Sequence, residues 1–184
     1  MQVTAMRWLL TISSWKLSIV LALIYILFPV FLLPWSMQEA PSSLGPLDLQ
    51  FSYTPTIAYE HLDSFGPEGR AAYFRTSLIV DTAYPVTYCA LFMVLTTQLL
   101  KAGNWAVRPF LWLNALPLVV FAFDLAENAS ILSLLLAYPE RMERVARLAG
   151  TFTTLKWSSV VVFALCLSTL LLLLVKQRLQ PARS

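Results

Sequence analysis

The sequence predicts an all-α, polytopic membrane protein, in which four transmembrane helices form a bundle and a short extramembrane helical cap joins the first helix to the second. Two observations support this fold class. Of the 184 residues, 58% are hydrophobic and only 12% are charged, whereas a soluble domain carries about 25% charged residues. The apolar residues also form four long runs, each reaching the roughly 20 residues that a helix needs to cross a bilayer. So much apolar sequence leaves too little polar sequence to cover it in water.

We expect the whole chain, residues 1–184, to form one integral membrane domain. Its predicted parts follow from the ends of the apolar runs. They are a first span at about 16–35, a cap at 36–76, a second span at about 77–101, a third span at about 109–138, an amphipathic loop at 139–150, a fourth span at about 151–176 and a tail at 177–184.

The first apolar run, Lys16–Trp35, could also be a secretory signal peptide with Arg7 as part of its basic flank. Its apolar stretch is longer than the usual core of a signal peptide, and no A-x-A cleavage site follows it. We therefore expect a helix that stays in the membrane. Aromatic residues at the ends of the spans, Trp35, Trp112 and Tyr138, are typical of anchors at the membrane interface.

The stretch "TPTIAYEHLDSFG" in the cap predicts a short helix with Thr54 as its N-cap, Pro55 at its first position and Gly66 at its end. Its aromatic residues should pack the cap onto the bundle. We expect His61, the only histidine in the sequence, to be solvated in this helix.

The loop between the third and fourth spans, "PERMERVARLAG", predicts a separate amphipathic helix that begins after Pro139 and stops at Gly150.

The distribution of Lys and Arg residues predicts how the chain is oriented in the membrane. If both termini are cytoplasmic, that side carries seven of them and the other side five, which agrees with the positive-inside rule.

Four charged side chains interrupt the apolar spans: Asp81, Asp124, Glu127 and Lys156. Measured from the basic residue at the inner end of each span, at 1.5 Å per residue, they lie about 24–30 Å along their helices. They therefore share one level in the outer half of the membrane. A charge that faces lipid costs about 2.5–3.5 kcal/mol, so each should point into the bundle.

Helical spacing adds polar neighbours to these charges. Asn128 shares a face with Asp124 and Glu127, and Tyr84 and Tyr88 share a face with Asp81. The predicted polar pocket therefore consists of Asp81, Tyr84, Tyr88, Asp124, Glu127, Asn128 and Lys156.

Pro85 should add a further polar group to this pocket. A proline removes the hydrogen bond to the carbonyl four residues earlier, which here belongs to Asp81. A free backbone oxygen beside a carboxylate is a candidate site for a cation or a hydrogen-bond donor.

Charge balance leaves three explanations for the pocket open. Three carboxyls and one lysine would carry a net charge of about −2 if all were ionised, which is unfavourable in an apolar interior. Either some acids remain protonated, or a cation or cationic ligand binds, or water reaches the site.

The absence of several known sequence motifs argues against the classes of function that depend on them. The H-E-x-x-H, G-x-S-x-G, P-loop and dinucleotide-binding glycine patterns do not occur, and the net charge of +3 gives no reason to expect nucleic acid. No metal-ligand motif appears, and no cofactor can be assigned. Cys89 and Cys166 lie in apolar runs and should be buried thiols.

The segments "GPLDLQFSYTP", "GPEGRAAYFR", "YPVTY", "FDLAEN" and "LKW" resemble an uncharacterised family of bacterial four-helix integral membrane proteins. The resemblance extends from Gly45 to about Trp157. It implies the same architecture and nothing more, so no activity comes with it. For the protein itself we expect a location in the bacterial inner (plasma) membrane.

Three functional hypotheses remain. The first is a pocket, open toward the outer face, that binds a small molecule, a lipid or a cation. The second is a lipid-modifying enzyme, with Asp124 or Glu127 as acid–base group and Lys156 as electrostatic stabiliser. The third is a charge network that only holds the helices together. Apart from the lipid bilayer and such a ligand, the sequence identifies no partner, and it leaves the oligomeric state open.

Overall fold

The computed structural model describes residues 4–32 and 44–180, and these residues form helices without any strand. The main helices are α1 (Thr4–Ile12), α2 (Trp15–Leu27), α4 (Pro55–Ser64), α5 (Gly66–Ala102), α6 (Arg108–Leu111), α7 (Ala115–Ala137) and α8 (Glu143–Leu179). Shorter turns are η1 (Phe28–Leu32), η2 (Leu47–Leu49) and η3 (Trp112–Asn114).

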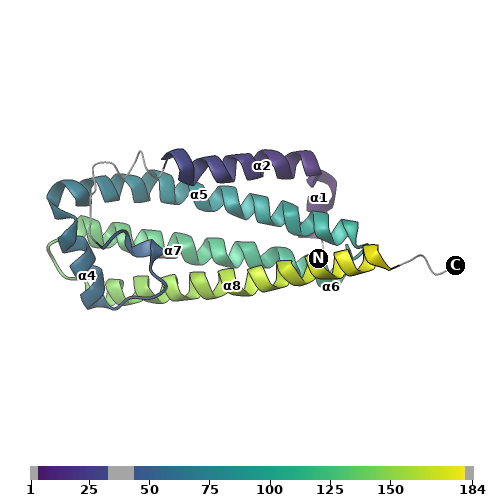
Figure 1. Cartoon of the computed structure of the whole chain (residues 1–184). Coiled ribbons are helices and arrows are strands. Elements are labelled where there is room, and N and C mark those ends of the chain that lie inside the picture. The colour runs from purple at the N-terminus through teal and green to yellow at the C-terminus, as the bar shows by residue number, and fades with distance from the viewer. Residues whose placement is uncertain (1–3, 33–43, 181–184) are drawn as a thin grey trace.

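Among the described residues, three helical segments are long and apolar enough to cross a membrane: α5, η3 together with α7, and α8. The apolar helix formed by α2 and η1, Trp15–Phe31, is shorter than these. Residues 33–35, which complete the first predicted span and include Trp35, lie outside the described residues. The three long helices therefore bear out a multi-pass membrane protein, and α2 runs beside them (Figure 1).

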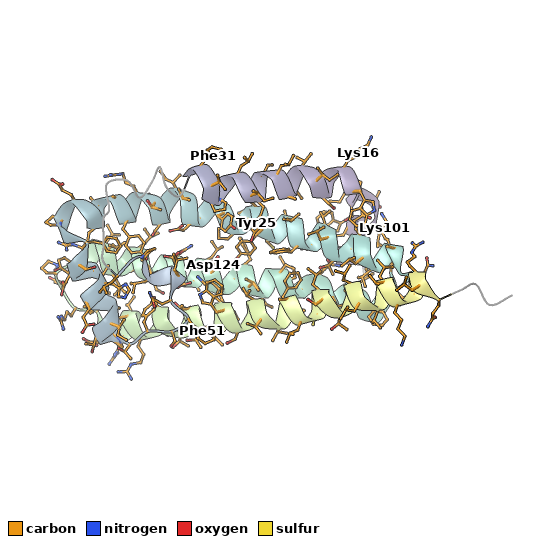
Figure 2. All side chains as sticks on the ribbon, viewed as in Figure 1. Lys16, Tyr25, Phe31, Phe51, Lys101 and Asp124 are labelled. Atoms are coloured by element: carbon orange, nitrogen blue, oxygen red, sulfur yellow. The ribbon has the colours of Figure 1, made fainter. Side chains whose placement is uncertain are left out.

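The packing order across the bundle is α2, α5, α7 and α8. The α7 helix packs along both α5 and α8, whereas α2 packs chiefly on α5. Figure 2 shows Tyr25 on the inward side of α2, while Lys16 and Phe31 lie on its outward side. Outward apolar side chains such as Leu165 and Leu172 on α8, which are 64% and 69% exposed, suit contact with lipid rather than water.

The cap lies across one end of these helices, and α4 forms its main part (Figure 1). As predicted, Pro55 occupies the first turn of α4, and the Thr54 Oγ1 accepts a hydrogen bond from the Ile57 backbone N–H at 3.4 Å. Gly66 follows α4 with a φ of +64°, a conformation that glycine adopts without strain.

A cluster of buried apolar side chains holds the cap against the bundle, which confirms the expected packing. It joins Tyr59 and Leu62 of α4 to Tyr73 of α5, Leu134 of α7 and Ala149 of α8. This end of the molecule is referred to below as the cap end.

Two predicted helix boundaries are wrong. The α5 helix begins at Gly66 rather than near residue 77, so the last part of the predicted cap and the second predicted span form one helix. The α8 helix runs from Glu143 without a break, and Gly150 does not stop it.

Gly150 instead permits close contact between α8 and the cap. A Cβ atom added at this position would lie 2.2 Å from the backbone oxygen of Tyr53. Only a glycine allows the two backbones to approach so closely. Tyr53 is itself buried, and burial raises the pKa of its hydroxyl above the ordinary value.

His61 is buried rather than solvated, and its Nδ1 lies 2.8 Å from the backbone oxygen of Gly45. This contact joins α4 to the segment that leads into η2. The expectation of a solvated side chain is therefore wrong, because the ring has a hydrogen-bonding partner within the cap.

The opposite end of the molecule contains α1, which the sequence patterns did not predict. Lys101, in the last turn of α5, donates hydrogen bonds to the backbone oxygens of Leu10 at 3.2 Å and Ser13 at 2.9 Å. These carbonyls at the end of α1 have no helical partner, so the lysine satisfies them. Ser14 then caps α2 by accepting a hydrogen bond from the Leu17 N–H.

Candidate functional site

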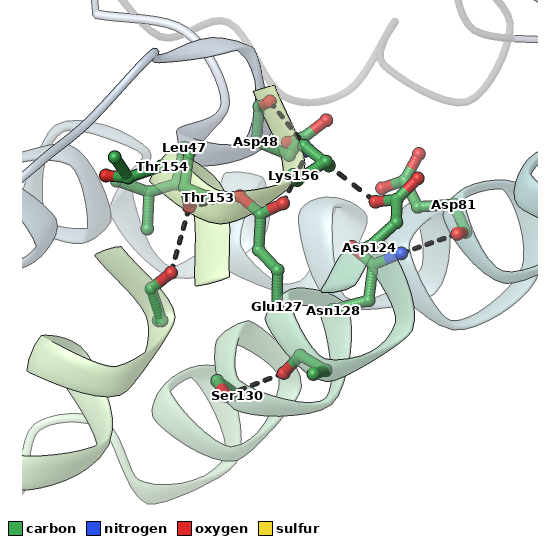
Figure 3. Close-up of polar contacts among 12 residues, drawn as sticks. Leu47, Asp48, Asp81, Asp124, Glu127, Asn128, Ser130, Thr153, Thr154 and Lys156 are labelled. Carbon is green, nitrogen blue, oxygen red and sulfur yellow. Dashed lines mark hydrogen bonds and ion pairs between the residues drawn. The ribbon is translucent and has the colours of Figure 1, made fainter. Parts of the chain in front are cut away.

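Lys156 lies at the centre of the polar side chains in the cap-end half of the bundle (Figure 3). Its Nζ lies 2.5 Å from the Glu127 Oε2 and 3.5 Å from the Asp124 Oδ1. It also donates a hydrogen bond to the backbone oxygen of Asp48 at 3.1 Å. One ammonium group therefore links α8, α7 and the η2 turn of the cap.

Glu127 is completely buried, with 0% of its surface exposed. Besides its ion pair with Lys156, its Oε1 accepts a hydrogen bond from the Thr153 hydroxyl at 2.5 Å. Thr153 is also fully buried. Both oxygens of this carboxyl are therefore engaged inside the protein, away from any surface.

Asp124 occupies a different position, one turn earlier on α7. The Tyr88 hydroxyl of α5 donates a hydrogen bond to its Oδ2 at 2.9 Å, and its side chain is 14% exposed. The two neighbouring acids thus differ in environment: Glu127 is sealed in the α7–α8 contact, and Asp124 faces a cavity.

The backbone oxygen of Asp81 is not free, in contrast to the expectation from Pro85. The Asn128 side-chain amide donates a hydrogen bond to it at 2.5 Å (Figure 3). Proline leaves this carbonyl without its helical donor, and the amide on α7 takes that donor's place. Of the two partners expected for this oxygen, a cation or a hydrogen-bond donor, the structure shows the donor, and Asn128 thereby links α5 to α7.

A cavity of about 340 Å³ lies beside this network. Five elements line it: α2, η2, α5, α7 and α8. The lining residues are Tyr25, Asp48, Leu49, Asp81, Tyr84, Pro85, Tyr88, Phe92, Pro117, Val120, Asp124, Lys156, Trp157, Val160, Phe163, Ala164 and Leu167.

The cavity has a polar zone and an apolar zone. The polar zone contains three carboxyls, on Asp48, Asp81 and Asp124, and the ammonium of Lys156. The apolar zone combines aliphatic side chains with six aromatic ones. Several of the rings contact one another: Tyr25 stacks on Tyr84 with ring centroids 5.4 Å apart, and Tyr84 meets Tyr88 edge-on at 5.8 Å.

Of the seven residues predicted for the pocket, five line this cavity: Asp81, Tyr84, Tyr88, Asp124 and Lys156. The remaining two, Glu127 and Asn128, lie behind the wall, where they bind Lys156 and the Asp81 carbonyl respectively.

Asp48 is a site residue that the sequence reasoning missed. Its backbone oxygen accepts from Lys156, and its Oδ1 accepts a hydrogen bond from the Tyr73 hydroxyl at 3.2 Å. Asp48 precedes Lys156 by 108 positions, and no local pattern in the sequence signals that η2 folds over the pocket. The only available signal was the aromatic cap, which was expected to pack on the bundle.

Other polar groups of the spans lie outside this site. Thr97 donates a hydrogen bond from its hydroxyl to the Asn114 Oδ1 at 3.2 Å, nearer the other end of the bundle. Cys89 is buried as expected and Cys166 is half-buried, and both are free thiols. Among the described residues, no group of three or more His, Cys, Asp or Glu side chains is arranged to hold a metal ion.

The fold and the cavity together describe an α-helical membrane protein with an amphipathic internal pocket. No protein-family model matches the chain, and no significant match was found among curated proteins or among solved structures.

Proposed function

We propose that this protein is a four-span membrane bundle whose pocket, in the outer half of the membrane, binds a small molecule, a lipid or a cation. In this arrangement α2 is the first span, the cap lies outside and both termini are cytoplasmic. The motifs quoted above support kinship with the uncharacterised bacterial four-helix proteins, and thus a place in the inner membrane.

The observation that carries the proposal is the surplus of carboxyls around the cavity. Three acids line it beside a single ammonium group, and that ammonium lies closer to the buried Glu127 than to Asp124. Unbalanced charge in an apolar interior is unfavourable. A polar or positively charged group in the cavity would compensate it.

Binding agrees better with the geometry than catalysis by Glu127 does. A general acid or base must come within hydrogen-bond reach of its substrate, and Glu127 and Thr153 are sealed between α7 and α8. A purely structural network would need only the buried Lys156, Glu127 and Thr153. It would give no reason for the carboxyl of Asp81 to lie on a cavity wall.

Native mass spectrometry of gently solubilised protein tests the proposal. We expect a discrete adduct on the wild type that is lost in Asp81→Asn, because that change removes a cavity carboxyl without altering the size of the side chain. Glu60→Gln is the matched control, since Glu60 lies exposed on α4 in the cap.

The control variant should keep the adduct at the wild-type level. Identical spectra for the wild type and Asp81→Asn, both gently solubilised from membranes of the native host, would contradict a ligand site. The carboxyls would then be part of the scaffold.

A further inference from the structure

We propose that the ligand is a cationic amphiphile dissolved in the membrane, which enters sideways between α8 and α2 and places its charged group among Asp48, Asp81 and Asp124. This inference rests on the proposed binding function and specifies the class of ligand and its route.

The charge at the polar end of the cavity selects for a cation. Lys156 donates to the backbone oxygen of Asp48 and not to its carboxyl, which instead accepts from Tyr73. The Lys156 ammonium is shared between Asp124 and Glu127. Among the described residues, the Asp48 and Asp81 carboxyls therefore line the cavity without an oppositely charged side chain paired to either of them. A positively charged headgroup would complement them.

The aromatic wall favours an apolar body and adds to the attraction for a cation. From Tyr88 the run of rings continues to Phe92 at 6.2 Å between centroids, and from Phe92 to Phe163 at 5.1 Å. Rings from α2, α5 and α8 thus meet around one space. Ring faces attract organic cations, and their area favours a hydrocarbon or aromatic tail.

The volume agrees with an organic ligand. Small-molecule pockets measure roughly 300–1,000 Å³, and this cavity measures about 340 Å³. A bare metal ion would leave most of that space unfilled, whereas the headgroup and the first part of a chain would fill it.

The position of the opening indicates the route. Of the residues that line the cavity, only Leu49 on η2 and Ala164 on α8 are exposed. The η2 turn lies over the polar zone at the cap end, and Leu47 is fully buried with its N–H bonded to the Tyr73 hydroxyl at 3.0 Å. The cap thus covers the cavity on the side that faces water.

The side near Ala164 faces a different environment. Around it on α8, Val161, Val162 and Leu165 are 51%, 50% and 64% exposed, which is typical of a lipid-facing surface. Across the opening, Tyr25 of α2 forms the other wall, and α2 packs on α5 rather than along α8. A molecule already dissolved in the bilayer can therefore reach the cavity without crossing the cap.

Binding of labelled dodecyltrimethylammonium to the protein in lipid nanodiscs, corrected for empty nanodiscs, tests the ligand class. We expect saturable binding that neutral dodecanol and anionic dodecanoate do not displace. Asp81→Asn should weaken binding about tenfold or more, since it removes the carboxylate that would pair with the ligand's cationic headgroup in a largely desolvated site. Glu60→Gln should leave it unchanged.

Ala164→Trp tests the route, because an indole at this position would fill the opening. We expect association of dodecyltrimethylammonium to slow about tenfold. Ala122→Trp is the matched control, since Ala122 is exposed on α7 and does not line the cavity. Should Ala164→Trp not fold, Ala164→Leu gives the same comparison with a smaller side chain.

The outcomes separate this inference from the proposed function. Equal displacement by dodecanol would overturn the cationic ligand, and unchanged association in Ala164→Trp would overturn the lateral route. A native adduct that depends on Asp81, together with no binding of dodecyltrimethylammonium, would contradict this inference and leave the proposed binding function standing. Absence of both the adduct and the binding would sink the proposed function with it.

Discussion

Lys156 is the side chain on which the polar network depends. It is 7% exposed, and it holds a completely buried Glu127 at 2.5 Å. Thr153, three residues earlier on α8, holds the other oxygen of the same carboxyl. The pair is therefore a structural support for the cavity wall, and Asp124 is the carboxyl partner of Lys156 that lines the cavity.

Replacing Lys156 with methionine should destabilise the protein by about 3 kcal/mol, because it leaves a buried carboxyl without its counter-charge. Unfolding of detergent-solubilised protein, followed by circular dichroism, measures this loss. Adding Glu127→Gln to the first change should recover most of the stability. Lys176→Met, on the exposed end of α8, is the control and should have little effect.

If the double variant were destabilised as much as Lys156→Met alone, Lys156 would stabilise the protein through packing or through Asp48, and not through Glu127.

The α8 helix is the element that connects the spans to the cap. It continues through Gly150, where the cap backbone at Tyr53 approaches α8 too closely for any Cβ. Two turns further along the same helix, Lys156 reaches η2 through the Asp48 carbonyl. The cap is thus fixed to α8 at two positions, one by close backbone packing and one by a charged hydrogen bond.

Gly150→Ala separates helix propensity from packing. In an exposed helix this change stabilises by about 1 kcal/mol. Here we expect a loss of about 1–3 kcal/mol, as is usual when a crowded contact is overfilled, because the added Cβ would overlap the Tyr53 oxygen. Thermal unfolding in detergent shows whether Gly150→Ala stabilises or destabilises the protein. A higher melting temperature in the variant would contradict the close contact.

At the scale of the whole molecule, α1 and the last turns of α8 lie at the end opposite the cap (Figure 1). Lys101 ties α1 to the end of α5 there. In the part of the chain that the structure describes, three helices are long enough to span a membrane, and α2 runs beside them. Whether α2 also crosses decides the number of spans and the location of both chain ends.

The proposed four spans require both ends of the chain on the same side of the membrane. Single cysteines added at each terminus, in a background with Cys89→Ser and Cys166→Ser, should therefore react equally with a membrane-impermeant maleimide. We expect neither to react in intact cells and both to react in inverted vesicles. Labelling of one end only in intact cells would mean an odd number of spans.

The sequence was sufficient to predict much of the fold and part of the candidate site, for local reasons. The rise per residue of an α-helix places Asp81, Asp124 and Lys156 at one level of the bundle. The helical spacing of their polar neighbours indicates which face of each helix points into the bundle. The structure brings these three together around one cavity. The predicted roles of Thr54 as N-cap and of Pro55 in the first turn of α4 were also confirmed, since the start of a helix depends on residues next to one another.

Features that depend on contacts between distant residues were not predictable in this way. Asp48 joins the site only because η2 folds onto α8, and Gly150 is required by a backbone that lies far away in sequence. The partner of the Asp81 carbonyl, Asn128, is on another helix. Each of these depends on tertiary packing that no pattern within one segment contains.

The order of the helices along the chain has a consequence for how the protein is synthesised. Asp124 and Glu127 lie on α7, while Lys156, their basic partner among the described residues, lies on α8, which leaves the ribosome after α7. During insertion of the proposed spans, the acids therefore precede their counter-charge. A nascent chain that has not yet released α8 holds unpaired carboxyls, and they have to stay protonated or near water until it arrives.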